Sequence, residues 1–184
     1  MYIRPFFSFL VAFLFHNYTY SQVQADFTAD TTFSCDPITI TFSDQSTGNI
    51  TSWQWDFDGK TSTLQNPSVT FTQKGNYTVS LSVSDGTNSD TETKTAYISI
   101  YNKPSANYSS SIKEGCSPLT VSFTNSSTLG DAPIDIFSWD FGDGSNPDSS
   151  ENPIHTYLSK SNPKYPVSLE IIDENGCSDV TIVD

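Results

Sequence analysis

The sequence predicts an all-β protein made of two tandem antiparallel β-sandwiches. Helix formers such as Ala, Leu, Glu and Met are scarce, whereas Thr, Val, Ile, Tyr and Phe, which favour strands, are common. Apolar and polar residues alternate with a period of two, and no segment shows a convincing apolar period of 3.6. The second half of the chain repeats the landmarks of the first half in the same order, which indicates a duplicated domain.

The 184-residue chain is strongly acidic, with 21 acidic and 8 basic residues and a formal net charge of −13. A charge this negative repels phosphate backbones, so the composition argues against nucleic-acid binding. Aromatic and β-branched residues recur throughout the chain, which argues against full disorder. The length allows one or two domains, each with a modest core.

Residues 1–21 have the pattern of a secretory signal peptide. Arg4 is their only charged residue, a compact apolar run follows over 5–15, and Thr19 and Ser21 supply small side chains before a cut at Gln22. The run is too short to cross a hydrocarbon layer of about 30 Å, so we expect no transmembrane span. The mature protein is therefore expected to be secreted or exposed at the cell surface.

The repeat sets the expected domain boundaries. Residues 35–37 (Cys-Asp-Pro) align with 116–118 (Cys-Ser-Pro), and after a short insertion in the second copy the two Trp-Asp-Phe triplets align. Each copy is long enough to be a small autonomous domain. We expect a first domain over 24–101, a short linker over 102–105 and a second domain over 106–184.

Within the first copy, alternating segments are expected to be strands, and the polar, glycine-containing segments between them turns. The expected strands cover residues 38–42, 53–57, 77–83 and 90–100. The expected turns lie at 47–49, 58–59, 74–76 and 85–86. These elements predict two antiparallel sheets, each with an inner and an outer face. The last strand of the second copy, over 178–184, is shorter than its counterpart, so we expect the chain to be part of a longer polypeptide.

Residues 139–144 (Trp-Asp-Phe-Gly-Asp-Gly) resemble the signature of PKD domains, which are immunoglobulin-like sandwiches. The resemblance spans nearly the whole mature chain, although the first copy has the shorter string Trp-Asp-Phe-Asp-Gly over 55–59. It implies motif and core roles for Trp55, Asp56, Phe57, Asp58, Gly59 and Tyr77, and in the second copy for Trp139, Asp140, Phe141, Gly142, Asp143, Gly144 and Tyr165.

The acidic string has two interpretations. Trp139 and Phe141, two positions apart, enter the core together, while the glycines and Asp143 suit a tight turn. We favour this structural role and expect no resident metal or other cofactor. The alternative is a calcium loop, because nearby segments supply carboxylate oxygens, although no spaced Asp ladder like that of an EF-hand is present. The candidate calcium donors are Asp131, Asp135, Asp140 and Asp143.

Trp53 and His155 are also candidate site residues. Trp53 shares a strand face with Trp55 and Phe57, which favours core packing, but an exposed indole there would form a sugar-stacking platform. His155 is expected to be a partly buried hydrogen-bonding residue and not a metal ligand or a base.

The resemblance also implies a disulfide. Gly-Cys near the start and Asn-Gly-Cys near the end recur together in bacterial PKD-like repeats, so we expect Cys116 to pair with Cys177 in the exported protein. Cys35 has only Asn88 or Ser89 opposite it in the first copy. We therefore expect Cys35 to be either a buried small hydrophobic residue or an intermolecular cross-linker.

The sequence contains no arrangement typical of a hydrolase, such as Gly-x-Ser-x-Gly or a histidine cluster, so we expect no enzymatic activity. PKD-like domains typically serve in bacterial surface proteins and beside secreted hydrolases. The resemblance therefore implies a non-catalytic adhesion or spacer module that contacts cell-surface proteins or polysaccharides. The alternative is a module that binds polysaccharide directly through exposed aromatic residues such as Trp53.

Overall fold

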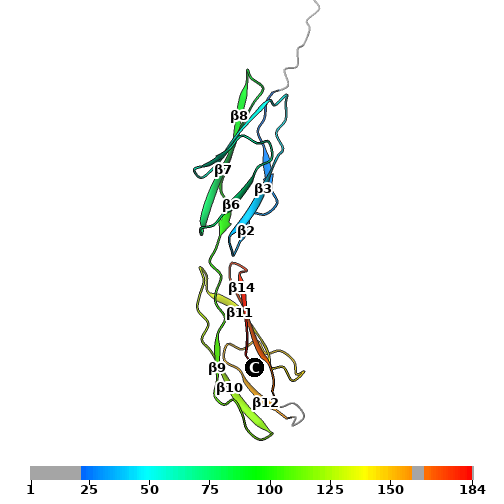
Figure 1. Cartoon of the computed structure of the whole chain (residues 1–184), viewed down its shortest axis with the longest axis vertical. Helices are drawn as coiled ribbons and strands as arrows, with labels where there is room; N and C mark the ends of the chain where they lie inside the picture. Colours follow the sequence, from blue (N-terminus) through cyan, green and yellow to red (C-terminus); the bar gives the residue numbers. More distant parts are fainter. Residues whose placement is uncertain (1–21, 159–163, 184) are drawn as a thin grey trace, which may run out of the picture.

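The computed structural model describes residues 22–158 and 164–183, and it forms two β-sandwiches stacked end to end (Figure 1). The signal-peptide prediction lies outside these residues. Secondary structure in both described ranges consists of strands and turns, and neither range holds a helix that could span a membrane. The predicted all-β class and tandem arrangement are confirmed.

The first sandwich packs a three-stranded sheet against a five-stranded sheet. The three-stranded sheet has the order β1 (Phe27–Ala29), β3 (Ile38–Asp44), β6 (Ser68–Phe71). The five-stranded sheet has the order β2 (Phe33–Ser34), β8 (Ser89–Ile100), β7 (Gly75–Ser84), β4 (Ser52–Phe57), β5 (Lys60–Ser62). Neighbouring strands pair antiparallel except β2 and β8, which pair in parallel.

The second sandwich repeats this plan, and its described residues form two three-stranded sheets. One has the order β12 (Ile154–Tyr157), β10 (Leu119–Asn125), β9 (Tyr108–Ser110), and the other β11 (Ile134–Asp140), β13 (Val167–Asp173), β14 (Ser178–Val183). All of these pairs are antiparallel. Strand β11 therefore occupies the place of β4, and β13 that of β7.

Each sandwich has its own hydrophobic core, because the period-two pattern sends alternate side chains inward. In the first core Phe42 contacts both Trp55 and Phe57, whose rings stack at 5.6 Å. In the second core Phe123 contacts Trp139 and Phe141 in the same way. The outward residues are mostly Ser and Thr, and several of their hydroxyls bond across strands, as Thr39 does with Thr70 at 2.8 Å. The inward aromatic residues therefore stabilise each sandwich separately.

Candidate functional site

The tryptophans of the two signature strings lie at the centres of the cores. Trp55 and Trp139 are fully buried, and each indole N–H donates 2.9 Å to a backbone carbonyl, that of Leu64 and of Ser150 respectively. A buried indole N–H needs such a partner, so these two bonds fix the ring orientation in each domain.

The acidic residues of the strings hold the turns that follow β4 and β11. Asp56 accepts a bond from the Gly59 N–H at 2.7 Å, and Asp140 accepts one from the Gly142 N–H at 2.9 Å. Gly142 has φ +71°, and a Cβ there would lie 2.4 Å from the Pro166 carbonyl oxygen, so no other residue fits. In both strings the aromatic residues therefore belong to the core, and the acidic and glycine residues form the turn that follows the strand.

Asp143 and His155 form a side-chain pair beside the second turn, with 2.9 Å between Asp143 Oδ2 and His155 Nε2. The imidazole stacks on Phe141 at 4.1 Å and meets the edge of Tyr157. Burial would raise the pKa of Asp143, but hydrogen bonds from Ser145 and His155 outweigh it and lower the pKa below its usual value. The pair ties the turn to β12, and these contacts give His155 a packing and hydrogen-bonding role.

The four candidate calcium donors do not gather around one point. Asp131 bonds Lys74 and Asn102 at the boundary between the sandwiches, while Asp143 bonds Ser145 and His155. Across residues 22–158 and 164–183 no three His, Cys, Asp or Glu side chains are grouped so that they could hold a metal ion. Calcium prefers six to eight oxygen ligands, so this donor set does not fit the ion.

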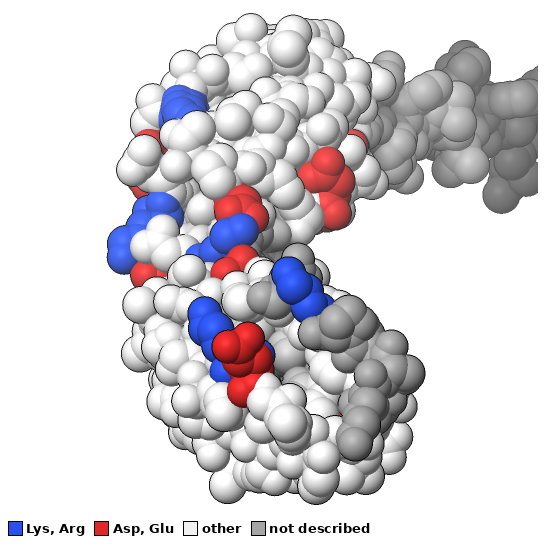
Figure 2. All heavy atoms as spheres, turned by 60° about the horizontal axis from the view of Figure 1, so that its bottom comes forward, with Lys and Arg blue, Asp and Glu red and all other residues white. Residues whose placement is uncertain are grey.

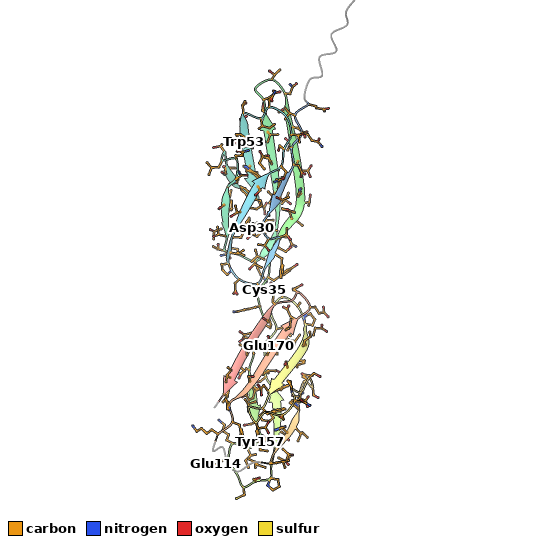
Figure 3. The ribbon with its side chains drawn as sticks, turned by 90° about the vertical axis from the view of Figure 1, so that its right-hand side faces the viewer. Asp30, Cys35, Trp53, Glu114, Tyr157 and Glu170 are labelled. Atoms are coloured by element: carbon orange, nitrogen blue, oxygen red, sulfur yellow. A yellow bond between two sulfur atoms is a disulfide. The ribbon has the colours of Figure 1, made fainter. Side chains whose placement is uncertain are left out.

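Trp53 lies toward the upper end of the first sandwich (Figure 3), and it is half-buried and packs against the first core. Its indole N–H donates 2.7 Å to Asp44 Oδ2, which also accepts a bond from Gln65 at 3.1 Å. Burial raises the pKa of Asp44, but the bonds from Ser46, Trp53 and Gln65 outweigh it and lower the pKa. Trp53 is also one of the residues that line a shallow groove beside β4 and β7, together with Gln54, Thr63, Ser82 and Val83.

Tyr77 and Tyr165 occupy equivalent places near the start of β7 and just before β13. The Tyr77 ring packs against Phe71 at 4.7 Å, and its hydroxyl donates 2.7 Å to the Gln73 carbonyl. The Tyr165 ring stacks on Tyr157 at 4.6 Å. Both tyrosines therefore pack at the end of their sandwich that is lower in Figure 1.

The predicted disulfide is wrong in one partner. Cys177 bonds Cys35 of the first sandwich, with 5.5 Å between the Cα atoms, and Cys116 is an exposed free thiol. The reason is position: Cys177 lies in the β13–β14 turn at the upper end of the second sandwich, whereas Cys116 precedes β10 at the opposite end. A bond between Cys116 and Cys177 would have to span the whole domain, which a disulfide cannot do.

The turn that carries Cys177 is held by Asp173, a buried carboxylate that is 3% exposed. Asp173 Oδ1 accepts bonds from the backbone N–H groups of Asn175 (3.0 Å) and Cys177 (2.8 Å). The Asp173 N–H in turn donates 2.9 Å to the Cys177 carbonyl. These three hydrogen bonds hold the turn that carries the Cys177 sulfur toward the first sandwich.

Polar contacts around Asp131 accompany the disulfide at the boundary that we call the junction, formed by Cys35, Asp36, Lys74, Asn102, Lys103, Gly130, Asp131 and Cys177. Asp131 pairs with Lys74 at 3.0 Å and accepts the Asn102 N–H at 2.7 Å. These two donors lower the pKa of Asp131. Lys103 Nζ lies 3.8 Å from Asp36 Oδ2. Figure 2 shows basic and acidic side chains next to each other where the two sandwiches meet.

Gly130 permits a close backbone approach at the junction. A Cβ at this position would lie 2.2 Å from the Asn102 carbonyl oxygen, which is far closer than atoms can approach. The Asp131 N–H donates 3.1 Å to that same oxygen. The linker is thus pinned to the second sandwich by backbone contacts that only glycine allows.

Comparisons with known proteins agree with this architecture. A family model described as PKD domain matches residues 22–100 and again 101–184. The solved fibronectin(III)-like modules of Clostridium thermocellum CbhA are 11% identical, with a TM-score of 0.51 over 86% of this chain and 92% of that chain. This likeness shows the fold alone.

Two further solved structures align with lower scores. Three N-terminal domains of the bacteriophage RB49 outer capsid protein Hoc are 10% identical, with a TM-score of 0.38 over 89% of this chain and 58% of theirs. A carbohydrate-binding module from the β-sandwich superfamily is 16% identical, with a TM-score of 0.39 over 90% of this chain and 97% of that one. The family model, by contrast, covers both sandwiches, and the chain belongs to the PKD domain family as a tandem pair of PKD domains.

Proposed function

We propose that this chain is a non-catalytic, exported spacer and adhesion module, whose two sandwiches are held in a fixed end-to-end orientation. The observation that carries the proposal is the Cys35–Cys177 disulfide, which joins the two domains and not two parts of one domain. A covalent bond on one side of the junction and a short linker on the other leave little freedom for bending. A rigid pair of sandwiches would hold any domain attached to one end at a fixed distance from whatever is attached to the other end.

Chemistry of the described residues supports a role without catalysis. The carboxylates with lowered pKa values accept hydrogen bonds from turns or neighbouring strands, as Asp44, Asp131 and Asp143 do. A general acid needs the opposite shift, which keeps its proton near neutral pH. The Ser- and Thr-rich outer faces and the negative charge keep such a module soluble.

The same disulfide supports a location outside the cytosol, because such bonds persist in oxidising compartments. Cleavage of the signal-like segment is tested by the intact mass of the exported protein. A mature chain that starts at Gln22 agrees with the proposal, whereas a chain that retains residues 1–21 contradicts it.

Small-angle X-ray scattering tests the spacer role. We expect the oxidised chain to scatter as one elongated particle with a narrow distribution of lengths, and the Cys35→Ala variant to show a broader distribution. Cys116→Ala is the matched control, because it removes an exposed thiol and should leave the curve unchanged. Identical curves for the oxidised chain and Cys35→Ala would contradict a rigid junction.

A second candidate function is direct polysaccharide binding at Trp53. The groove that includes Trp53 combines the apolar Trp53 and Val83 with hydroxyl and amide side chains such as Ser82 and Gln54, a mixture that suits a sugar. Polysaccharide pull-down separates the candidates: binding that Trp53→Ala abolishes, and that a substitution of its counterpart Phe137 leaves intact, favours this role. Loss of binding counts only if the melting temperature shows that the variant is folded, since Trp53 also packs against the core.

A further inference from the structure

The two sandwiches carry a cysteine at the same place. Cys35 lies three residues before Ile38, the first residue of β3, and Cys116 lies three residues before Leu119, the first residue of the equivalent strand β10. Figure 3 shows Cys35 at the junction and Glu114, two residues before Cys116, at the far lower end of the molecule. Cys35 is bonded to the next sandwich, whereas Cys116 is exposed and free.

The partner cysteine also has a fixed place, in the turn between the last two strands. In the second sandwich that turn carries Cys177, held by Asp173. In the first sandwich the equivalent turn is held by Asp85, which accepts bonds from Thr87 (2.8 Å) and Asn88 (2.7 Å), and it has no cysteine. The pattern is directional: a cysteine at the lower end of one sandwich meets a turn cysteine at the upper end of the next.

We infer that the Cys116 end of the second sandwich is a docking face for a further PKD-type sandwich, joined in tandem and closed by a disulfide between Cys116 and a cysteine in that partner's last turn. Two thiols then become one S–S bond, and their two protons and two electrons pass to a disulfide oxidant of the exterior compartment. The inference rests on the repeated junction geometry, so it can fail while the spacer role stands.

An uncovered apolar side chain marks the same face. Leu158 is 76% exposed and directly follows β12, and it corresponds to Thr72, which follows β6 and lines a pocket with Cys35 at the junction. The Ser117 hydroxyl donates 2.9 Å to the Leu158 carbonyl, which places the leucine beside Cys116. Leu158 therefore occupies the position that adjoins the junction in the first sandwich, where Thr72 lies beside Cys35.

A second copy of this chain is a poor partner for the face. Its Cys177 is already bonded to its own Cys35, so it has no turn thiol to offer. Cys116 of two chains could pair with each other, but that tail-to-tail contact is not the geometry of the junction. The partner is therefore a sandwich whose last turn carries an unbonded cysteine.

The test extends the full chain by a second copy of residues 96–184, with the added copy of Cys116 replaced by serine. Asp90 accepts a bond from the Ala25 N–H, and Asp179 accepts the equivalent bond from the Ala106 N–H, each at 2.8 Å. Asp179 therefore corresponds to Asp90, and five residues further on Asp184 corresponds to Thr95. The added residues therefore continue the chain in the register of the first sandwich and supply a linker and a third sandwich. The protein is oxidised in a glutathione buffer and mapped as non-reduced peptides.

We expect two disulfides, one between Cys35 and Cys177 and one between Cys116 and the added copy of Cys177. No thiol should then remain for alkylation. In the control with Cys116→Ser, the added cysteine should react with a thiol reagent. A folded extended chain with an alkylated Cys116, or one linked through Cys116 to Cys116 of another molecule, overturns the inference. If the third sandwich does not fold, a second extension appends the first sandwich with Asn88→Cys and Cys35→Ser, and the same map decides.

Discussion

Breaking the junction disulfide should lower stability by an amount that the structure allows us to estimate. The bond joins residues 142 positions apart, and in the chain-entropy treatment a loop of this length stabilises by about 5 kcal/mol. The freed junction also gains motion in the folded state, although the Asp131 contacts with Lys74 and Asn102 remain. We therefore expect Cys35→Ala to cost about 2 to 5 kcal/mol.

Urea denaturation, followed by tryptophan fluorescence under non-reducing conditions, measures this cost. Cys116→Ala is the matched control, and because Cys116 is exposed we expect a change within about 0.5 kcal/mol. Adding a reductant should bring the unmodified chain to the midpoint of Cys35→Ala. The opposite ranking, with a large cost for Cys116→Ala and none for Cys35→Ala, would refute the reasoning and place the bond within the second sandwich.

Three further predictions concern single residues. Gly130→Ala should broaden the length distribution in small-angle scattering, because its Cβ would lie 2.2 Å from the Asn102 carbonyl oxygen; an unchanged curve would contradict this. Trp139→Ala should cost about 3 to 5 kcal/mol in urea denaturation of the second sandwich, as large-to-small core changes do, and a cost below 1 kcal/mol would argue against the buried position. The pKa of Asp44 is lowered in the folded state, so the ionised carboxylate stabilises the fold fully above about pH 4, and this contribution is lost as the pH falls through the folded pKa. As the pH is lowered from about 6 to about 2, the melting temperature of Asp44→Asn should therefore fall less steeply than that of the unmodified chain. Parallel curves for the two proteins would contradict this.

Much of the fold follows from the period-two pattern and the repeat. The alternation at 53–57 and 77–83 predicted β4 and most of β7, because one face of each strand must be buried. Short elements escaped prediction: β2 has two residues and β5 three, too few to show a period. They form through pairing with β8 and β4, which is information from distant parts of the chain.

The disulfide shows where local reasoning failed. The family resemblance predicts a bond within one copy, yet a disulfide depends on which ends of the domains meet. The sequence did contain a signal for the correct pair. Both copies have a cysteine shortly before an equivalent strand, β3 or β10, but only the second copy has a cysteine in the turn between its last two strands. Cys35 therefore lacked a partner in its own domain, and the next domain supplied it.

The half-buried state of Trp53 was also beyond the sequence. The strand pattern placed Trp53 on the same face as Trp55 and Phe57, but the indole is held by Asp44 of β3, and β7 supplies Ser82 and Val83 to the groove that includes Trp53. Contacts of this kind join segments far apart in the chain, so a strand pattern alone does not determine how much of a side chain is covered.

The most direct test of a covalently closed junction is a peptide map of the non-reduced, alkylated protein. We predict one linked peptide pair that contains Cys35 and Cys177, together with an alkylated Cys116. A linked pair that contains Cys116 and Cys177, or three alkylated cysteines, would contradict the account.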